Sequence, residues 1–510
     1  MLVNLSMPSR TLNKNYLLSK IIRPPLIIFV IMIIGGLLRI FDLGSKSFWG
    51  DELISIWHSA DIIDIKSFFT SHRGNAHPPL YFLLLKFWSI GGNDEYYLRL
   101  LSVLFGTLAI PITYLVGREF FKTKASILAA FLVAISPFLL RFDREVRMYP
   151  LFVFLSIISI FFFIKALRQD QNKYWIGYVI VTILNTYTHY HAFLIIASMW
   201  LFYFVRFRTY NLLLKKALLS QFVIALCFCF WLPTFISHLM NSSALAGEPT
   251  KFPTIFGFWI RPAYLLFSYS LGQTVLPWNF LITIPGAITF FFLFFYGIKP
   301  MLKIKETAVF FLIILLFPIL LALLISDAMP RYLVFLSPIY CLIIAHGISN
   351  ISHNIFQIFA FFLVTIIIGF SLANYYQNRE FHILANVDPW REVGRYLSEN
   401  YKKDDQVFYI GGGLPLKYYA GLNNVPILGA KMVTLKQMKI YEKGRVWLIV
   451  TNPAYKKEGE EVIQWMNEHY NIITEKKYYK DSDYIRKTKY FKKDFLEYRI
   501  KVFLYVRANY

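Results

Sequence analysis

The stretch Pro24–Phe41, PPLIIFVIMIIGGLLRIF, is followed after a short polar interval by Trp49-Gly50-Asp51-Glu52. The first segment is an apolar run long enough to cross about 30 Å of hydrocarbon as a helix. The second segment places two adjacent carboxylates just beyond the end of that helix. Charge near hydrocarbon is costly and usually functional, so this pair is the first candidate for a catalytic site.

The composition of the chain agrees with a membrane protein. Of its 510 residues 57% are hydrophobic and 16% are charged, whereas about a quarter of the residues of an average soluble protein are charged. The apolar residues form runs of roughly 18–20 residues, and we predict a polytopic α-helical membrane protein with about 11 transmembrane helices, within a range of roughly 10–13. The predicted spans are 24–41, 97–117, 125–141, 150–167, 174–190, 192–207, 217–236, 280–298, 307–325, 332–348 and 355–373. The run at 78–91 is short enough to lie at the interface instead, and 254–279 is ambiguous.

The distribution of lysine and arginine among the short loops predicts the orientation of the chain. Basic clusters at residues 10–23, 118–124, 168–173, 206–216 and 299–305 all fall on one side of the membrane when every predicted span is counted. Because such loops stay in the cytoplasm, we expect a multi-pass protein of the cytoplasmic (inner) membrane with a cytoplasmic N-terminus. The segments that then face outward are 42–96, 142–149, 237–279, 326–331 and the region from about residue 374.

The formal net charge of +23 arises partly from these inner loops. Basic residues that are scattered over two faces of a membrane are a poor pattern for nucleic acid binding. We therefore expect anionic lipid and a phosphate-bearing substrate as partners, and no nucleic acid. The three cysteines, Cys227, Cys229 and Cys341, lie within apolar spans, so neither a disulfide nor a zinc framework is expected.

Residues 374–510 differ from the rest of the chain, because charge increases there and long apolar runs are absent. Asp388-Pro389-Trp390 is typical of a helix start, with aspartate as N-cap and proline in the first turn. Strands are predicted at 406–410, 446–450 and 500–506, and an amphipathic helix at 458–470. This alternation predicts a small extracytoplasmic α/β domain after the transmembrane module of residues 1–373. Gly411-Gly412-Gly413 lacks the spacing of a phosphate-binding loop and is expected to be a turn, and the domain itself to dock or cap the substrate.

The predicted outer loops carry polar residues that membrane anchoring alone does not require. Asp51, Glu52 and His77 lie in the first outer loop, and Asp143, Glu145 and Arg147 in the second. His189 and His191 lie at the outer end of a predicted span, and Arg331 lies just before another. We expect the chemistry of the protein on this outer face.

Five short motifs along the chain resemble one family. They are Trp49-Gly50-Asp51-Glu52, His77-Pro78-Pro79-Leu80-Tyr81, Arg99-Leu100-Leu101-Ser102, Arg144-Glu145-Val146-Arg147-Met148-Tyr149 and Pro330-Arg331-Tyr332. In this order and on the predicted outer side, they closely resemble the bacterial and archaeal protein-mannosyltransferase-like branch of the GT-C glycosyltransferases. The aminoarabinose transferases that modify lipid A share that architecture. The resemblance covers roughly the first 375 residues.

The resemblance implies transfer of a sugar from a polyprenyl-phosphate carrier to an acceptor on the extracytoplasmic face. The acceptor class stays open between lipid A, a glycan and a protein. In such proteins the aspartate of the first loop is the proposed general base, which corresponds to Asp51 here. The neighbouring Glu52 is expected to position Asp51 or to bind a cationic partner within the same catalytic pair.

A departing lipid phosphate needs fixed positive groups, and Arg147 and Arg331 are the candidates, with His77 as a further donor-binding residue. The guanidinium group has a planar fork that suits phosphate oxygens. The alternative for each arginine is interfacial anchoring. Arg331 departs from that pattern because it lies on the side where the positive-inside bias would not place it.

The remaining polar residues are expected around the acceptor or behind the site. Asp143 and Glu145 either orient the acceptor or pair with nearby arginines such as Arg144 and Arg147. The other members of this group are Tyr149, His189, His191 and Tyr332. No cofactor is required by the sequence; a divalent metal site, if present, would use Glu52, His77, His189 and His191, although their spacing is not a known zinc spacing.

Three alternative functions remain open from the sequence. A flippase or transporter would be indicated by internal repeats and mid-membrane charges, and we find neither pattern. A lipid-linked glycan polymerase or ligase would also use a long outer loop and a phosphate-binding arginine. A non-enzymatic scaffold would leave the ordered carboxylates and arginines without an explanation.

Overall fold

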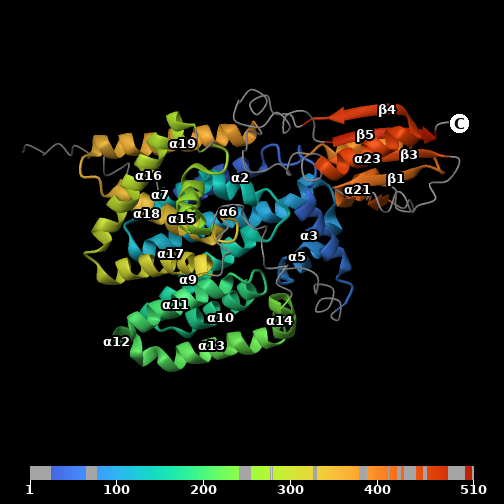
Figure 1. Ribbon diagram of the computed structural model, residues 1–510. Coiled ribbons are helices and arrows are strands. Elements are labelled where there is room, and N and C mark those ends of the chain that lie inside the picture. The colour runs from blue at the N-terminus through green and yellow to red at the C-terminus, as the bar shows by residue number, and fades with distance from the viewer. Residues whose placement is uncertain are drawn as a thin grey trace, which may run out of the picture.

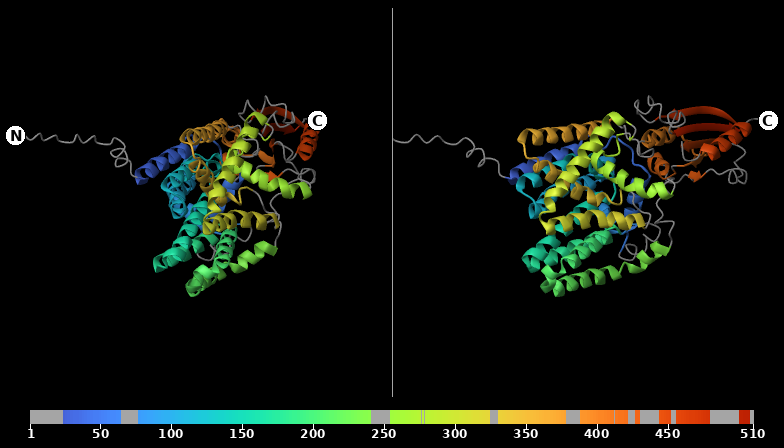
Figure 2. Two further views of the ribbon diagram at one scale, coloured as in Figure 1. Left: turned by 90° about the vertical axis from the view of Figure 1, so that its left-hand side faces the viewer. Right: turned by 60° about the vertical axis from the view of Figure 1, so that its left-hand side comes forward.

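The computed structural model describes residues 24–64, 77–240, 254–275, 277, 279–324, 330–377, 388–411, 413–421, 427–429, 444–451, 456–479 and 500–507. A bundle of helices occupies the first part of the chain, and a sheet with flanking helices follows it and lies beside one end of the bundle (Figures 1 and 2). The basic cluster predicted at 10–23 lies outside the described residues.

Every predicted span coincides with one or two helices. The helices are α2 (Pro24–Ile40), α6 (Glu95–Phe120), α7 (Thr123–Ile135), α8 (Pro137–Asp143), α9 (Tyr149–Gln169), α10 (Asn172–Thr186), α11 (Ala192–Val205), α12 (Phe207–Tyr210), α13 (Leu214–Cys229), α14 (Leu232–Met240), α16 (Phe280–Met301), α17 (Lys305–Leu324), α18 (Ser337–Ser349) and α19 (Asn354–Tyr376). The short turns η3 (Asn211–Leu213) and η4 (Val334–Leu336) precede α13 and α18. The ambiguous stretch after residue 253 contains α15 (Thr254–Leu271).

Within the described residues, six helices are long and apolar enough to cross a membrane, or seven if the bent pair α7 and α8 forms one span. The two members of that pair meet at an angle of 54°, because Ser136 caps α8 through its side chain and Pro137 starts the new helix. Shorter apolar helices account for several of the other predicted spans. The prediction of a polytopic helical membrane protein is confirmed.

Two helices of the predicted first outer loop add Leu53, Tyr81, Phe82 and Leu85 to the core of the bundle. They are α3 (Gly50–Asp61) and α5 (Leu80–Trp88), which ends in the short turn η2 (Ser89–Gly91) and matches the interfacial helix predicted at 78–91. The two helices pack against each other and lie between the bundle and the sheet (Figure 1). The first outer loop is therefore in a position to contact both parts of the molecule.

The C-terminal region forms a five-stranded sheet in the order β2-β1-β3-β5-β4. Its strands are β1 (Gln406–Ile410), β2 (Ile427–Gly429), β3 (Arg445–Thr451), β4 (Tyr470–Tyr478) and β5 (Ile500–Arg507). The central strand β3 pairs in parallel with β1 and antiparallel with β5. Helices α20 (Trp390–Asn400) and α21 (Gly413–Ala420) contribute to the core on one face, and α23 (Lys456–His469) to the core on the other.

The predicted α/β character of this region is confirmed, although not every element was predicted. Strands β1, β3 and β5 and helix α23 lie where their apolar patterns placed them. Helix α20 begins at Trp390 with Pro389 as its N-cap, one residue later than predicted. The glycine triplet begins with Gly411 at a φ of +73°, as a turn requires, and Gly412 lies outside the described residues. The domain boundary at 373/374 stays a prediction.

A buried ion pair ties the first span to the end of α8. The Arg39 Nε atom donates to Asp143 Oδ2 at 2.8 Å, and its Nη1 atom donates to the carbonyls of Gly35 and Ala134, each at 2.9 Å. A Cβ atom on Gly106 of α6 would lie 2.3 Å from the Asp143 carboxyl carbon, closer than atoms can approach. Gly106 therefore creates the space that the Asp143 carboxylate occupies.

We predict that Gly106→Ala destabilises the protein by about 1–3 kcal/mol, because the added methyl group must displace the buried carboxylate from Arg39. The measurement is thermal unfolding of the purified protein in detergent. Gly369→Ala in α19 is the matched control, since a Cβ atom there meets nothing within 4 Å and alanine has the higher helix propensity. Equal melting temperatures for the two variants would contradict the assignment.

Candidate active site

The two carboxylates of the first loop have opposite environments. The Asp51 side chain is 31% exposed, whereas the Glu52 side chain is 1% exposed. Both lie in the first turn of α3, which begins at Gly50 with Trp49 as its N-cap. Successive residues of a helix point about 100° apart. Glu52 therefore faces the protein interior, while Asp51 lies on a side of α3 that is partly open to solvent.

Glu52 is fully occupied by structural hydrogen bonds. Its Oε1 atom accepts from Arg99 Nε at 2.8 Å and from the Val146 amide at 2.9 Å. Its Oε2 atom accepts from Arg99 Nη2 at 2.8 Å and from the Trp49 amide at 3.2 Å. A carboxylate with four such bonds has no lone pair left for a substrate. Glu52 thus joins α3, α6 and the α8–α9 connection, and its predicted cationic partner is Arg99.

Arg99 is equally saturated. Besides the two bonds to Glu52, its Nη1 atom donates to the carbonyls of Leu43 and Lys46 at 2.9 and 2.8 Å, and Nη2 donates to the Ser47 carbonyl at 3.2 Å. These bonds use all five N–H donors of the guanidinium group. Arg99 therefore fixes the segment that leads into α3. The sequence motif that contains Arg99 did not indicate that Glu52 would be its partner.

Asp51 lies between two arginines from distant parts of the chain. Its Oδ2 atom is 3.9 Å from Arg147 Nη2 and also 3.9 Å from Arg331 Nη1. These separations are ion-pair contacts that are too long for hydrogen bonds. The carboxylate is consequently held in place by charge but keeps its lone pairs for another partner. The structure brings together three residues that the sequence analysis had named separately.

Arg147 is anchored on one side and unsatisfied on the other. Its Nη1 atom donates to the Asp51 carbonyl at 3.0 Å and to Ser55 Oγ at 3.2 Å, and Nη2 contacts His77 Nε2 at 3.2 Å. Its Nε atom is buried and has no hydrogen-bond partner among the described residues. A buried N–H without a partner is costly, which makes Arg147 a candidate for binding an anion.

Arg331 has a similar arrangement. Its guanidinium group lies over the Tyr332 ring at 4.9 Å, and Nη2 donates to the Tyr332 hydroxyl at 3.1 Å. Its Nε atom is also buried without a partner among the described residues. Tyr149 provides the corresponding ring for Arg147 at 5.7 Å. Each of the two tyrosines expected near the acceptor therefore lies against a phosphate-binding candidate.

His77 is a neutral acceptor in this arrangement. Arginine can only donate, so the His77 Nε2 atom that faces Arg147 must be unprotonated. Burial lowers the pKa of His77 well below its ordinary value, and the charge of Arg147 lowers it further. The neutral His77 ring thus carries its proton on Nδ1.

His189 and His191 lie behind the two tyrosines. The His189 ring stacks on Phe152 at 4.7 Å and is 5.3 Å from the His77 ring, and the His191 ring stacks on Tyr332 at 5.4 Å. The His189 Nδ1 atom accepts from the His191 amide at 3.1 Å. These contacts place the two histidines next to the residues that surround Arg147 and Arg331.

The possibility of a metal site at these histidines is not supported by their arrangement. Among the described residues, no group of three or more His, Cys, Asp and Glu side chains is placed to hold a metal ion. Glu52, the carboxylate considered for such a site, is occupied by Arg99. The described residues do not fit a metal centre.

The acidic residues of the second outer loop pair with arginines other than those considered. Asp143 pairs with Arg39, and Glu145 lies 3.9 Å from Arg141 Nε, one turn earlier in the chain. Arg144 donates to the Phe41 carbonyl at 2.7 Å and lies over the rings of Tyr375 and Tyr376. Asp143 thus has Arg39 as its partner, and Glu145 lies near Arg141 while its charge also acts on Arg147. Both carboxylates support the loop that carries Arg147.

The C-terminal domain is bound to the first outer loop next to the site. The Tyr419 hydroxyl of α21 accepts from the Phe48 amide at 2.6 Å and donates to Glu95 Oε1 at 2.7 Å. Arg391 of α20 forms an ion pair with the same Glu95 at 2.7 Å. Phe48 directly precedes the N-cap of α3, so these contacts fix the start of the helix that carries Asp51. Neither Tyr419 nor Arg391 was identified from the sequence.

Comparison with known proteins agrees with this architecture. A family model described as dolichyl-phosphate-mannose-protein mannosyltransferase matches residues 76–236. No curated protein sequence matches the chain. Among solved structures, ArnT from Cupriavidus metallidurans in the apo state has a TM-score of 0.60 at 11% identity, and the match covers 94% of this chain and 98% of that chain.

Two further solved structures share the fold. ArnT from Cupriavidus metallidurans bound to undecaprenyl phosphate has a TM-score of 0.53 at 10% identity, with 94% and 98% of the two chains covered. The archaeal oligosaccharyltransferase AglB from Archaeoglobus fulgidus, in complex with an inhibitory peptide and a dolichol-phosphate, has a TM-score of 0.55 at 14% identity, with 88% and 72% covered.

The match over residues 76–236 and the shared fold agree with the resemblance to the GT-C glycosyltransferases that the five motifs indicated. The chain is similar to the mannosyltransferase family in residues 76–236 and to ArnT in its fold.

We predict that acidification destabilises the protein through His77. The folded-state pKa of His77 is lowered, so below about pH 6.5 the unfolded chain binds a proton that the folded protein does not bind. The contribution of His77 to stability is therefore complete above pH 6.5 and is lost as the pH falls toward its folded pKa. Between pH 7.5 and 5.5 the wild type should lose about 1 kcal/mol more stability than His77→Gln, which keeps an acceptor for Arg147. The measurement is the melting temperature of both proteins at each pH, and parallel curves would contradict this role.

Proposed function

We propose that the protein transfers a sugar from a polyprenyl-phosphate donor to an acceptor hydroxyl on the extracytoplasmic face of the membrane, with inversion at the sugar C1 atom. The observation that carries the proposal is the position of the Asp51 carboxylate, 3.9 Å from both Arg147 and Arg331. A base and two cationic groups at one point are what such a transfer requires, because it releases a proton and a phosphate anion.

Asp51, and not Glu52, is the general base of this proposal. A base must reach the acceptor hydroxyl within about 2.6–3.2 Å, which requires an accessible oxygen with a free lone pair. Asp51 is partly exposed, and its ion pairs are longer than hydrogen bonds. Glu52 is buried and its four acceptor positions are occupied, so we assign it the positioning of α3.

Arg147 and Arg331 bind the donor phosphate in this proposal. Both have a buried Nε–H group without a partner, whereas every donor of Arg99 is used within the protein. Arg147 stays bound to the α3 backbone, so a phosphate on it would lie next to Asp51. His77 contributes its Nδ1–H group. Positive groups that are already oriented stabilise the charge of a leaving phosphate without reorganisation.

The reaction follows from these placements. Before the donor binds, the two arginines offset the charge of Asp51. When the donor phosphate binds the two arginines, Asp51 can accept a hydrogen bond from the acceptor hydroxyl. The acceptor oxygen attacks C1, its proton passes to Asp51, and the bond between C1 and the phosphate oxygen breaks. The electron pair of that bond leaves on the polyprenyl phosphate, which Arg147 and Arg331 retain.

The remaining residues act in support of this centre. Tyr149 and Tyr332 hold the two arginines, and His189 and His191 pack behind the tyrosines. Asp143 and Glu145 hold the connection that carries Arg147. The structural likeness to proteins solved with undecaprenyl phosphate and with dolichol-phosphate supports a lipid phosphate as the donor carrier.

We predict that Asp51→Asn lowers the transfer rate by about 10²–10⁴-fold without loss of folding, because it removes the base and keeps the shape. Glu52→Gln should instead lower the folded yield and the stability by about 3–5 kcal/mol, because it leaves the buried Arg99 charge unpaired. The assay is release of polyprenyl phosphate by purified protein in nanodiscs, with polyprenyl-phosphate sugars offered beside nucleotide sugars.

Asp61→Asn at the other end of α3 is the matched control and should keep the wild-type rate. Arg331→Ala should weaken donor binding and leave folding intact. An Asp51→Asn protein that keeps a third of the wild-type rate would exclude Asp51 as the base. Tight binding of a lipid-linked glycan with no turnover would instead indicate a flippase or a glycan ligase.

We also propose that the N-terminus is cytoplasmic and that the α/β domain lies outside the cell membrane. The supporting observation is the contact of this domain with the loop that carries Asp51, which requires both to lie on the same side. A tag at the C-terminus should therefore be labelled by an impermeant reagent added to intact spheroplasts. Labelling that appears only after lysis would invert the orientation.

A further inference from the structure

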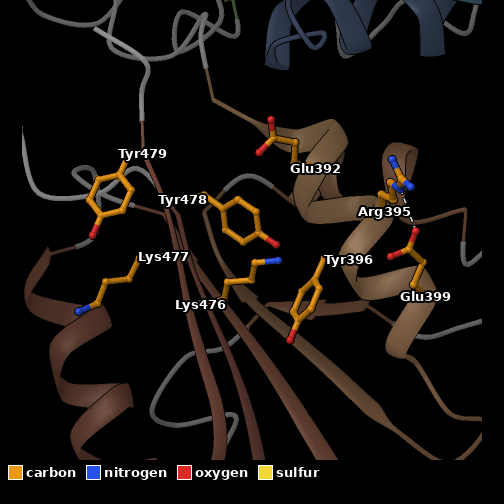
Figure 3. A pocket seen from close by; sticks show the side chains of 8 residues that line it. All are labelled: Glu392, Arg395, Tyr396, Glu399, Lys476, Lys477, Tyr478 and Tyr479. Atoms are coloured by element: carbon orange, nitrogen blue, oxygen red, sulfur yellow. Dashed lines mark hydrogen bonds and ion pairs between the residues drawn. The ribbon is translucent and has the colours of Figure 1, made fainter. Parts of the chain in front are cut away.

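A cavity of about 500 Å³ lies on the C-terminal domain, apart from the residues of the candidate active site. Its walls come from α20 on one side and from the end of β4 on the other (Figure 3). Strand β4 is the edge strand of the sheet, so no further described strand covers this side. The volume is in the range of cavities that bind small ligands, about 300–1,000 Å³.

The wall of the cavity presents a cation that has no acidic partner. Lys476 Nζ lies 4.0 Å from the centre of the Tyr396 ring and 5.3 Å from that of the Tyr478 ring. The other basic residues of the wall are paired, Arg395 with Glu399 at 2.8 Å and Lys477 with Glu475 at 3.4 Å. No ion pair involves Lys476 within the described part of the chain. Two aromatic faces hold an ammonium group in a defined position while its N–H donors remain available.

A second unsatisfied donor lies beside this cation. The Tyr478 side chain is only 6% exposed, and its hydroxyl has no hydrogen-bond partner among the described residues. Figure 3 shows the hydroxyl of Tyr478 and the ammonium group of Lys476 on the side that faces α20. Burial raises the pKa of Tyr478, so the phenol stays protonated and can donate. A buried hydroxyl without a partner is costly unless a ligand satisfies it.

The rim of the cavity adds a carboxylate on the side of α20. Glu392 of α20 lines the cavity and forms no ion pair with any described residue. A carboxylate accepts hydrogen bonds from sugar hydroxyls. Tyr479 also lines the cavity, but its side chain points to the other side of β4 from Lys476 and Tyr478 (Figure 3).

We propose that this cavity binds an acidic sugar, whose carboxylate or phosphate contacts Lys476 and the Tyr478 hydroxyl and whose hydroxyl groups contact the Glu392 carboxylate of α20. Two neighbouring donors without a partner favour an anion, and the carboxylate of the rim favours a hydroxylated body. Arg391 binds the outer loop from the residue next to Glu392, so α20 connects this cavity to the catalytic loop. In the proposed transfer, this sugar would be the acceptor glycan, and the domain that fixes Asp51 would hold it. Only the acceptor role of the sugar rests on the proposed function.

The test is binding to the full-length protein in nanodiscs without a donor, measured by calorimetry. The probes are tri-galacturonic acid, mannose 6-phosphate, neutral maltotriose and inorganic phosphate. Tri-galacturonic acid or mannose 6-phosphate should bind at least about tenfold more tightly than maltotriose, which cannot pair with Lys476. Lys476→Met should lose about tenfold in that affinity, and Tyr478→Phe about fivefold.

Two matched variants show whether these losses are local. Lys417→Met removes an exposed lysine of the same domain, and Tyr505→Phe removes a hydroxyl that bonds Asn467 near the opposite face of the sheet. Both should bind the acidic sugars like the wild type. Tyr478→Phe should keep the melting temperature, because it removes a buried hydroxyl that forms no bond.

Equal affinity for acidic and neutral sugars, or full affinity in Lys476→Met, would overturn the proposal. If inorganic phosphate binds as tightly as mannose 6-phosphate, the cavity recognises the anion alone, and the proposal that it recognises a sugar is wrong. Asp51→Asn should bind the acidic sugars normally, so failure of the transferase proposal and failure of this one are separate results.

Discussion

The buried ion pair between Glu52 and Arg99 is the interaction on which the rest of the site depends. Two hydrogen bonds join the pair, and backbone groups use the remaining donors of the guanidinium group and the remaining acceptor positions of the carboxylate. Burial of two charges costs about as much free energy as their attraction returns, so such a pair specifies geometry more than it adds stability. Here it joins the loop before α3, the start of α6 and the α8–α9 connection at one point. Because Glu52 must point inward, its neighbour Asp51 must point toward Arg147 and Arg331.

The arginines around the two carboxylates of α3 and the end of α8 divide into two groups by their hydrogen bonds. Arg39 and Arg99 have buried carboxylate partners and further bonds to backbone carbonyls. Arg147 and Arg331 are held by backbone and aromatic contacts, and each keeps a buried donor without a partner. The first group fixes elements relative to one another, and we propose that the second group binds an anion. A buried Nε without a partner does not by itself distinguish the two groups, because Arg141 and Arg144 have one as well; Arg147 and Arg331 differ from them in lying next to Asp51. The C-terminal domain adds to the first group through Tyr419 and Arg391, which hold the start of α3 from outside the bundle.

Much of the fold was predictable from local patterns. The apolar runs gave the helices because a segment that crosses hydrocarbon must be apolar throughout and must satisfy its own backbone. Strands β1, β3 and β5 were predictable because they are short and mostly buried. Strand β4 was missed because its residues are largely exposed, and β2 because it is only three residues long. The bend between α7 and α8 lay within one predicted span, where the proline that causes it was not distinguished from the apolar run.

The sequence by itself determined the class of the protein, its helices, and the set of polar residues on which a site could be built. Composition and periodicity are local properties, and the free energy of placing each segment in lipid or water depends on them directly. The tertiary structure alone decided the partners: Glu52 with Arg99 across 47 positions, Asp143 with Arg39 across 104, and Asp51 between Arg147 and Arg331. Such pairs form because folding removes charged groups from water, and a buried charge then needs a partner of opposite charge. No pattern along the chain records which charge will meet which, so only the three-dimensional structure shows that Glu52 is buried in an ion pair and that Asp51 stays accessible.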